Sequence, residues 1–161
     1  MKIAEILNSR MSFSFEVFPP KTDAGMEKLR SALQYYYNYK PDFISCTYGA
    51  GGSNAGRNVE VCQTIIDAGV TEVMTHFTCI GNTKDKINSE LETYRSMGME
   101  NVLAMRGDLP AGWEGTQGDF SYADGLIRYI KKEFPDFCIA AACYPDALGG
   151  VSDQAVDGVI R

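Results

Sequence analysis

Excess basic charge and long apolar runs are both missing from this sequence. Lysine and arginine number 15 against 21 aspartate and glutamate residues, so the formal net charge is −6. Nucleic acids and anionic membranes bind clustered Lys and Arg, and we therefore expect neither as a partner. No uninterrupted apolar run reaches the roughly 20 residues of a membrane span, and residues 2–8 form a short amphipathic pattern without a secretory signal. We expect a cytoplasmic protein.

Paired cysteine motifs are missing as well. The five cysteines are odd in number, show no CxxC spacing and stand mostly inside apolar runs: Cys46, Cys62, Cys79, Cys138 and Cys143. Disulfide scaffolds and zinc sites need paired spacings, so we interpret these residues as reduced core thiols and expect no metal site. The hydrophobic fraction of 45% and the charged fraction of 22% are ordinary, and we expect a single domain over residues 1–161.

What the sequence does contain is a steady alternation of apolar runs with amphipathic helical patterns. Strands and the loops that end them are predicted at 11–18, 41–53, 71–81, 101–110 and 137–145. Helices are predicted at 2–8, 25–39, 58–68, 83–97 and 121–134. The run 137–145 is continuously apolar, so we expect that strand to be buried on both faces.

Strands that alternate with helices specify parallel βα units, which build either an open doubly wound sheet or a (β/α)8 barrel. A doubly wound dinucleotide fold has GxGxxG after its first strand, but here Pro19 and Pro20 follow. In a barrel, functional side chains come from the C-terminal ends of several strands. Polar residues stand at those ends here: Glu16, Thr47, His76, Arg106 with Asp108, and Tyr144.

We therefore predict an α/β fold of the TIM-barrel type, present as about five of the eight units of a complete barrel. Such a piece leaves two strand edges with unpaired N–H and C=O groups. We expect that the chain is a fragment of a longer protein, or that a homo-oligomer or a partner chain covers these edges.

Glu16 and His76 are candidates for chemistry at the strand tips. Glu16 stands between Phe15 and Phe18, and a carboxyl group desolvated by aromatic neighbours can act as a general acid near neutral pH. The alternative is a salt-bridged glutamate at a strand end. His76 is the only histidine; it is either a satisfied core residue or an inward-facing donor to a ring carbonyl or phosphate of a cofactor.

The turn 106–108 combines three useful groups. Arg106 supplies an anion-binding guanidinium, Gly107 permits close approach of the backbone, and Asp108 can accept N–H bonds from a heterocycle. The alternative is a self-contained ion pair between Arg106 and Asp108. The glycine-rich loop 49–53 resembles a phosphate nest without the Walker lysine, which is a weak signal.

Four motifs in order give the chain a specific resemblance. They are FSFEVFPPKT at 13–22, PDFISCTYGAGGS at 41–53, THFTCI at 75–80 and NVLAMRGDLP at 101–110. Together they resemble methylenetetrahydrofolate reductase, and the similarity runs from residue 13 to residue 145.

The resemblance implies a (β/α)8 barrel that carries non-covalent FAD. Such an enzyme takes a hydride from NADH or NADPH and passes it to 5,10-methylenetetrahydrofolate, which gives 5-methyltetrahydrofolate for methionine biosynthesis. By matched motif, Glu16 corresponds to the general acid that opens the folate ring, and Asp108 to a carboxylate near both flavin and pterin. Thr47 matches a nicotinamide-side contact. The positions that match the FAD lining are Tyr48, His76, Arg106, Gly107, Asp108, Ala123 and Tyr144.

The sequence departs from the family pattern after Tyr144. Leu148 stands where the family has a histidine toward the FAD, Asp157 falls at the spacing of a cofactor-binding aspartate, and no lysine follows. We therefore expect the 161-residue chain alone to be impaired in turnover. Two rival hypotheses stay open: a non-catalytic remnant or subunit that completes its barrel with a partner, and a flavin-free barrel lyase that uses Glu16.

Overall fold

The protein is built on a sheet of parallel strands, seen in a computed structural model that describes residues 1–48 and 55–142. The strands are β1 Ser14–Val17, β2 Phe43–Cys46, β3 Glu72–Thr78, β4 Asn101–Met105 and β5 Cys138–Ala141. The helices are α1 Ile3–Ser9, α2 Asp23–Tyr37, α3 Ala55–Ala68, α4 Lys84–Ser96 and α5 Ala123–Glu133. The predicted alternation is confirmed. Within the described ranges, no helix is long and apolar enough to cross a membrane.

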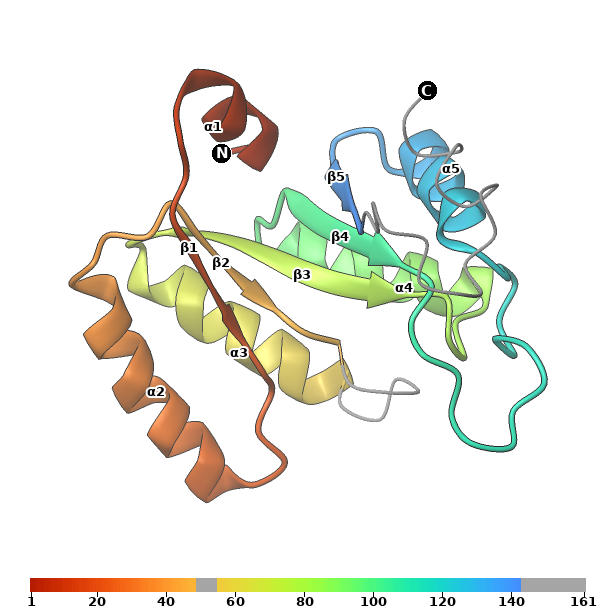
Figure 1. Cartoon of the computed structure of the whole chain (residues 1–161), viewed down its shortest axis with the longest axis horizontal. Coiled ribbons are helices and arrows are strands. Elements are labelled where there is room, and N and C mark those ends of the chain that lie inside the picture. The colour runs from red at the N-terminus through yellow and green to blue at the C-terminus, as the bar shows by residue number, and fades with distance from the viewer. Residues whose placement is uncertain (49–54, 143–161) are drawn as a thin grey trace.

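The strand order decides between the two architectures. Neighbours follow the chain order β1-β2-β3-β4-β5, and all four pairings are parallel. Right-handed crossovers that always advance in one direction place every connecting helix on the same face, whereas a doubly wound sheet reverses its order at a switch point. Figure 1 shows this arrangement, with α3 and α4 behind the strands and the other face turned to the viewer. The winding is that of a barrel, and the sheet is not closed.

The core lies between the sheet and its helices. Side chains alternate along each strand, so every second residue faces the helix layer. The buried side chains of this layer include Val17, Ile44, Phe77 and Val102 from the strands, and Leu33, Ile65, Leu91 and Leu126 from the helices. Each such side chain contributes about 1.5–3 kcal/mol relative to exposure, so this layer fixes the positions of the strand tips.

The helix ends follow the sequence signals. Thr22 accepts a hydrogen bond from the Gly25 N–H at 3.1 Å, and Thr83 accepts one from the Lys86 N–H at 3.4 Å, as N-cap residues do. Gly69 follows the end of α3 with a φ of 62°, a left-handed conformation that favours glycine.

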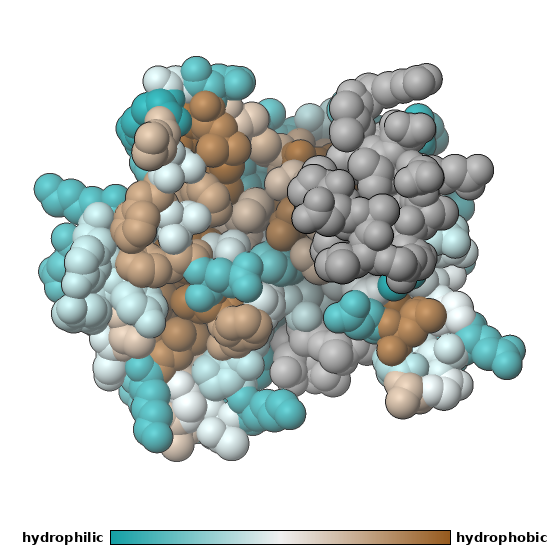
Figure 2. Space-filling view, viewed as in Figure 1, coloured by the Kyte–Doolittle hydropathy of each residue, from teal (hydrophilic) through white to brown (hydrophobic). Residues whose placement is uncertain are grey.

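The prediction that the fifth strand is buried on both faces is wrong. All four residues of β5 are only half-buried, because among the described strands β5 lies at the edge of an open sheet and pairs with β4 alone. Figure 2 shows the viewed face of the molecule, where hydrophobic side chains gather around β1 with hydrophilic ones among them. Cys46, Cys62 and Cys79 are buried free thiols, as predicted.

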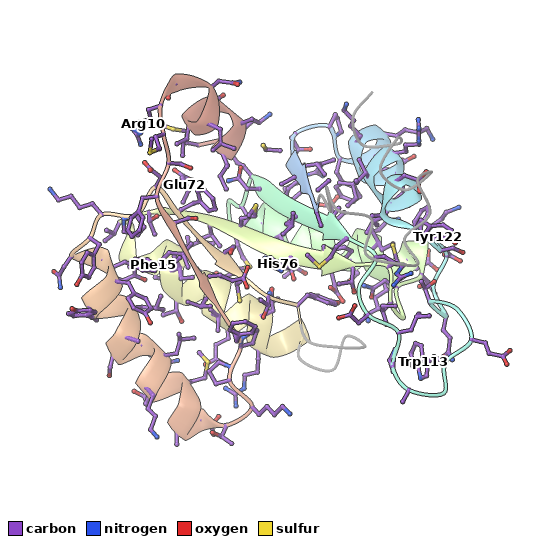
Figure 3. The ribbon with its side chains drawn as sticks, viewed as in Figure 1. Arg10, Phe15, Glu72, His76, Trp113 and Tyr122 are labelled. Carbon is purple, nitrogen blue, oxygen red and sulfur yellow. The ribbon has the colours of Figure 1, made fainter. Side chains whose placement is uncertain are left out.

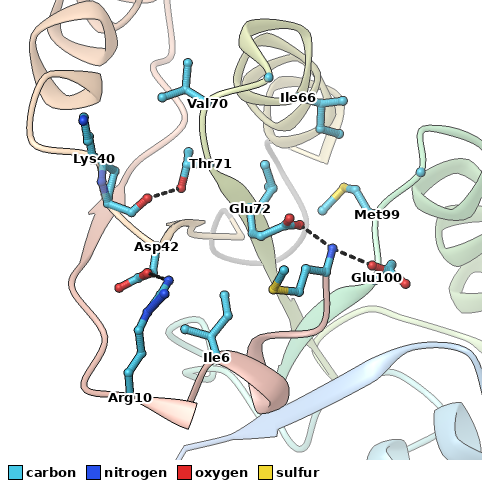
Figure 4. A pocket seen from close by; sticks show the side chains of 15 residues that line it. Ile6, Arg10, Lys40, Asp42, Ile66, Val70, Thr71, Glu72, Met99 and Glu100 are labelled. Carbon is cyan, nitrogen blue, oxygen red and sulfur yellow. Dashed lines mark hydrogen bonds and ion pairs between the residues drawn. The ribbon is translucent and has the colours of Figure 1, made fainter. Parts of the chain in front are cut away.

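The end of the sheet at which the strands begin is held by the N-terminal segment. The Ile3 N–H donates to Asn101 Oδ1 at 2.8 Å, and Asn101 Nδ2 donates to the Val73 carbonyl at 3.3 Å. A pocket of about 510 Å³ opens here (Figure 4), lined in part by Asp42 and Arg10, which form an ion pair. It lies at the opposite end from the predicted site residues, where a barrel carries stability rather than chemistry.

Candidate functional site at the strand ends

The inner face of the sheet, the face without helices, carries the polar groups of the candidate site. On β3, Thr75 and Phe77 turn toward the helices, so His76 and Thr78 turn inward. On β1, Val17 packs into the core, which places Glu16 on the inner face.

Glu16 and His76 meet across the intervening strand β2. The distance from Glu16 Oε2 to His76 Nε2 is 3.4 Å. His76 lies near the centre of the sheet in Figure 3 and is 7% exposed. In a barrel, each layer of interior side chains comes from alternate strands. The contact of Glu16 on β1 with His76 on β3 joins two such alternate strands. Because Ser45 on β2 pairs in register with Glu16 and is small, it leaves room for the contact.

The electrostatics of His76 are set by burial and by Glu16. Burial lowers the pKa of His76 below its ordinary value, and the carboxylate of Glu16 acts in the opposite direction. The two groups are close enough for a hydrogen bond but are not oriented for one, so the buried Nε2 has no hydrogen-bond partner among the described residues. A buried polar atom without a partner is uncommon, and this one faces the position of a predicted ligand.

The predicted desolvation of Glu16 by its aromatic neighbours is wrong. Half of the Glu16 side chain is exposed. Phe15 points to the opposite face, where its ring stacks on Tyr36 with centroids 4.5 Å apart, and Phe18 is 68% exposed. Successive side chains of a strand alternate between faces, so an adjacent aromatic residue cannot cover Glu16. Its use as an acid stays a prediction.

The turn after β4 is open to a ligand at its charged ends. Arg106 is exposed; its Nε donates to the Gly107 carbonyl at 3.2 Å. Asp108 is also exposed, and among the described residues the hydrogen bond of the Arg106 side chain goes to the Gly107 carbonyl and not to Asp108. The alternative of a self-contained Arg–Asp turn is therefore not what the structure has.

Gly107 is required by its position. Its φ is 82°, and a Cβ there would lie 2.9 Å from Ile80 Cγ1 and 3.1 Å from Thr78 Cβ. The close approach that sequence reasoning predicted is thus an approach to β3. It buries Thr78, whose Oγ1 has no partner among the described residues. Thr78 was missed from the sequence, although its spacing of two from His76 places both on one face.

The loop after β4 is joined to the turn after β3. The Gly81 N–H donates to the Thr116 carbonyl at 2.8 Å, and the Lys84 N–H donates to Asp119 Oδ2 at 2.7 Å. A Cβ on Gly118 would lie 2.4 Å from the Cys79 carbonyl oxygen. These contacts fix the base of the loop that carries Trp113, which is half-buried.

The remaining predicted residues are not all in one place. Thr47 continues β2, and its N–H donates to the Val17 carbonyl at 3.0 Å. Tyr48 lies on the helix side: its hydroxyl donates to Glu90 Oε2 at 2.7 Å, and burial raises its pKa. Ala123 is the first residue of α5 and is half-buried. Three predictions lie outside the described residues: Tyr144, Asp157 and the loop 49–53.

Asn58, a buried residue of α3, was also missed. Its Nδ2 donates to the Thr47 carbonyl at 3.0 Å, and its Oδ1 accepts from the Tyr94 hydroxyl at 2.9 Å and from the Thr75 hydroxyl at 3.1 Å. It therefore ties the ends of β2 and β3 to two helices. A single polar residue in an amphipathic helix carries no distinctive sequence signal.

Comparison with known proteins identifies the family. The sequence profile of methylenetetrahydrofolate reductase matches residues 2–158. The chain belongs to the methylenetetrahydrofolate reductase family. It is 38% identical over 156 residues to methylenetetrahydrofolate reductase (NADH) 1 of Arabidopsis thaliana, covering 91% of this chain and 26% of that protein.

Bacterial members of the family are similarly related. The 5,10-methylenetetrahydrofolate reductase of Escherichia coli is 33% identical over 144 residues, which cover 89% of this chain and 47% of that protein. The corresponding protein of Pectobacterium carotovorum is 36% identical over 140 residues. The chain thus spans about half the length of these bacterial relatives and about a quarter of the plant one. The resemblance seen in the four motifs is confirmed.

Proposed function

We propose that residues 1–161 are the first part of a barrel that reduces 5,10-methylenetetrahydrofolate to 5-methyltetrahydrofolate. The observation that carries the proposal is the contact of Glu16 with the buried Nε2 of His76, which has no hydrogen-bond partner in the described part of the chain, toward the C-terminal ends of strands wound as in a barrel. In barrels of this type, chemistry sits at that end. Membership of the reductase family supplies the reaction class.

FAD is the cofactor that we propose for this site. Thr78 Oγ1 is buried on the inner face and has no hydrogen-bond partner among the described residues, and the guanidinium of Arg106, which follows the end of β4, is exposed. These groups fit a ligand rich in phosphate and carbonyl oxygens, which guanidinium and hydroxyl donors bind well. We infer that Thr78 and Arg106 hold FAD and that the imidazole ring of His76 lies against it, with Thr47, Gly107 and Ala123 adjoining.

When bound, FAD supplies the hydride transfer between a nicotinamide donor and the folate. The residues of this chain bind and orient the cofactor and the folate, and one of them moves a proton. Glu16 gives a proton to the folate nitrogen that leaves when the ring opens. Asp108, exposed beyond β4, accepts N–H bonds from the pterin. Because plant relatives are named as NADH-dependent, we propose NADH as the donor.

We further propose that additional βα units close the barrel, either in a longer chain or in a partner. Within residues 1–48 and 55–142, β1 and β5 each have a neighbouring strand on one side only, and unpaired strand edges attract further strands. We expect little or no turnover from residues 1–161 alone.

A fusion tests this proposal. Residues 1–161 replace the matching part of the Escherichia coli relative, so that its own C-terminal half completes the barrel. We expect the fusion to retain FAD, to oxidise NADH with menadione as acceptor and to reduce methylenetetrahydrofolate. Arg106→Met should lower the retained flavin, and Arg128→Met, an exposed arginine of α5, should not. A folded fusion without flavin, or full activity of residues 1–161 alone, would contradict the proposal.

A further inference from the structure

We propose that His76 is a positioning residue for Glu16, and that the two side chains share a proton between Glu16 Oε2 and His76 Nε2. The catalytic use of this pair rests on the proposed function. The existence of the pair does not, because it follows from the geometry of β1, β2 and β3.

The geometry leaves Nε2 with one polar neighbour. It is buried, it has no hydrogen-bond partner among the described residues, and Glu16 Oε2 is 3.4 Å away. A buried nitrogen without a partner loses a hydrogen bond that water would supply. The Glu16 side chain is half-exposed, so it is free to turn its carboxyl group toward Nε2.

The surrounding strands offer His76 no competing charge within the described residues. On β2, the inward residue nearest the pair is Ser45, which is uncharged. On β4, Leu103 pairs with His76 and Met105 lies beyond it, while the charged Arg106 follows the end of the strand and is exposed. Helices α2 to α5 pack against the other face of the sheet. Among the described residues, Glu16 is the charged group that raises the pKa of the imidazole, against the larger lowering by burial.

Burial keeps the imidazole neutral, so the proton state of the pair is set by tautomers. When Glu16 is protonated, its O–H donates to Nε2, and His76 carries its own proton on Nδ1. When Glu16 has given its proton away, the tautomer protonated on Nε2 donates to the carboxylate. Both states keep His76 uncharged, and the charge of the pair changes by the single proton that Glu16 releases. His76 thereby holds the carboxyl group toward the strand ends in either state.

The single histidine of the chain makes this pair directly observable. Nitrogen NMR of the protein labelled with ¹⁵N-histidine reads the titration midpoint and the tautomer of one imidazole. We expect Glu16→Gln to move the midpoint to lower pH, because it removes the charge that favours the imidazolium, and to abolish a pH-dependent change of tautomer. Asp108→Asn, an exposed carboxylate at the neighbouring strand end, is the matched control and should leave both unchanged.

A substitution of His76 tests the same pair independently. His76→Gln should change the ¹³C chemical shift of the Glu16 carboxyl group at fixed pH, because it replaces the ring nitrogen beside it, and should leave that of Asp108 unchanged. If the titration midpoint and the tautomer of His76 are unchanged in a folded Glu16→Gln protein, the proposed pair does not exist. These readings need neither flavin nor folate, so a failure of the proposed reductase function gives a different pattern, in which the pair is present and the fusion is inactive.

Discussion

Asn58 gives the sharpest prediction about stability, because its amide is fully buried and makes three hydrogen bonds of 3.1 Å or shorter. Its Nδ2 donates to the Thr47 carbonyl, and its Oδ1 accepts from Tyr94 and Thr75. Asn58→Ala leaves the Tyr94 hydroxyl and the Thr47 carbonyl without these partners, whereas the Thr75 hydroxyl keeps the His76 carbonyl at 3.1 Å. At about 1–3 kcal/mol for each buried group left unsatisfied, the loss is about 2–6 kcal/mol.

That loss is a large share of the roughly 5–15 kcal/mol by which a domain is stable. The matched control is Asn88→Ala in α4, where Asn88 accepts one partly buried hydrogen bond from Tyr129 at 2.8 Å. Both changes gain helix propensity equally, so their difference isolates the buried bonds. We expect a loss of about 1 kcal/mol in the control.

Urea unfolding, followed by circular dichroism and by the fluorescence of the single tryptophan, measures both free energies. The account of Asn58 would be refuted if Asn58→Ala lost no more stability than Asn88→Ala. Because Asn58 holds the carbonyl of Thr47, the same variant of the fusion should also retain less flavin.

Three further predictions concern stability at the site. Gly107→Ala should lower the free energy of unfolding by more than about 2 kcal/mol, because a steric clash adds to the cost of about 1 kcal/mol for a left-handed φ. Gly112→Ala is the control: Gly112 has the same φ of 82° and open space around it, so this variant should show the φ cost alone. Gly118→Ala should lower the melting temperature because its Cβ meets backbone atoms, while Gly56→Ala, in a helix with nothing within 4 Å, should raise it. Burial lowers the pKa of His76 in the folded protein. The contribution of the neutral His76 to the free energy of unfolding is therefore complete above the ordinary pKa of 6.5, and it falls as the pH drops below that value. His76→Gln should flatten that part of a stability curve.

The architecture could be predicted from the sequence because its signals are local. Apolar runs of strand length, threonine caps before helices and glycines after them all have short-range causes, and Thr22, Thr83 and Gly69 play the expected parts. The barrel winding also followed, since Pro19 and Pro20 stand where a doubly wound fold needs glycines.

The site was predicted less completely because its contacts are between strands. Strand alternation could have shown that Phe15 faces away from Glu16 and that Thr78 shares a face with His76, but the register that brings Glu16 to His76 depends on tertiary pairing. Continuous apolarity suggested two buried faces for β5, and position at the edge of the open sheet overrode it. The network of Asn58 joins residues far apart in sequence and has no local pattern.

The central claim is that the strand ends of this chain carry the acid of a folate reductase. The most direct measurement compares two half-reactions in the fusion carrying Glu16→Gln. We expect NADH oxidation with menadione to persist, because it needs no proton from Glu16, and the reduction of methylenetetrahydrofolate to be lost. Equal rates of methylenetetrahydrofolate reduction in the Glu16→Gln and unmodified fusions would contradict the account.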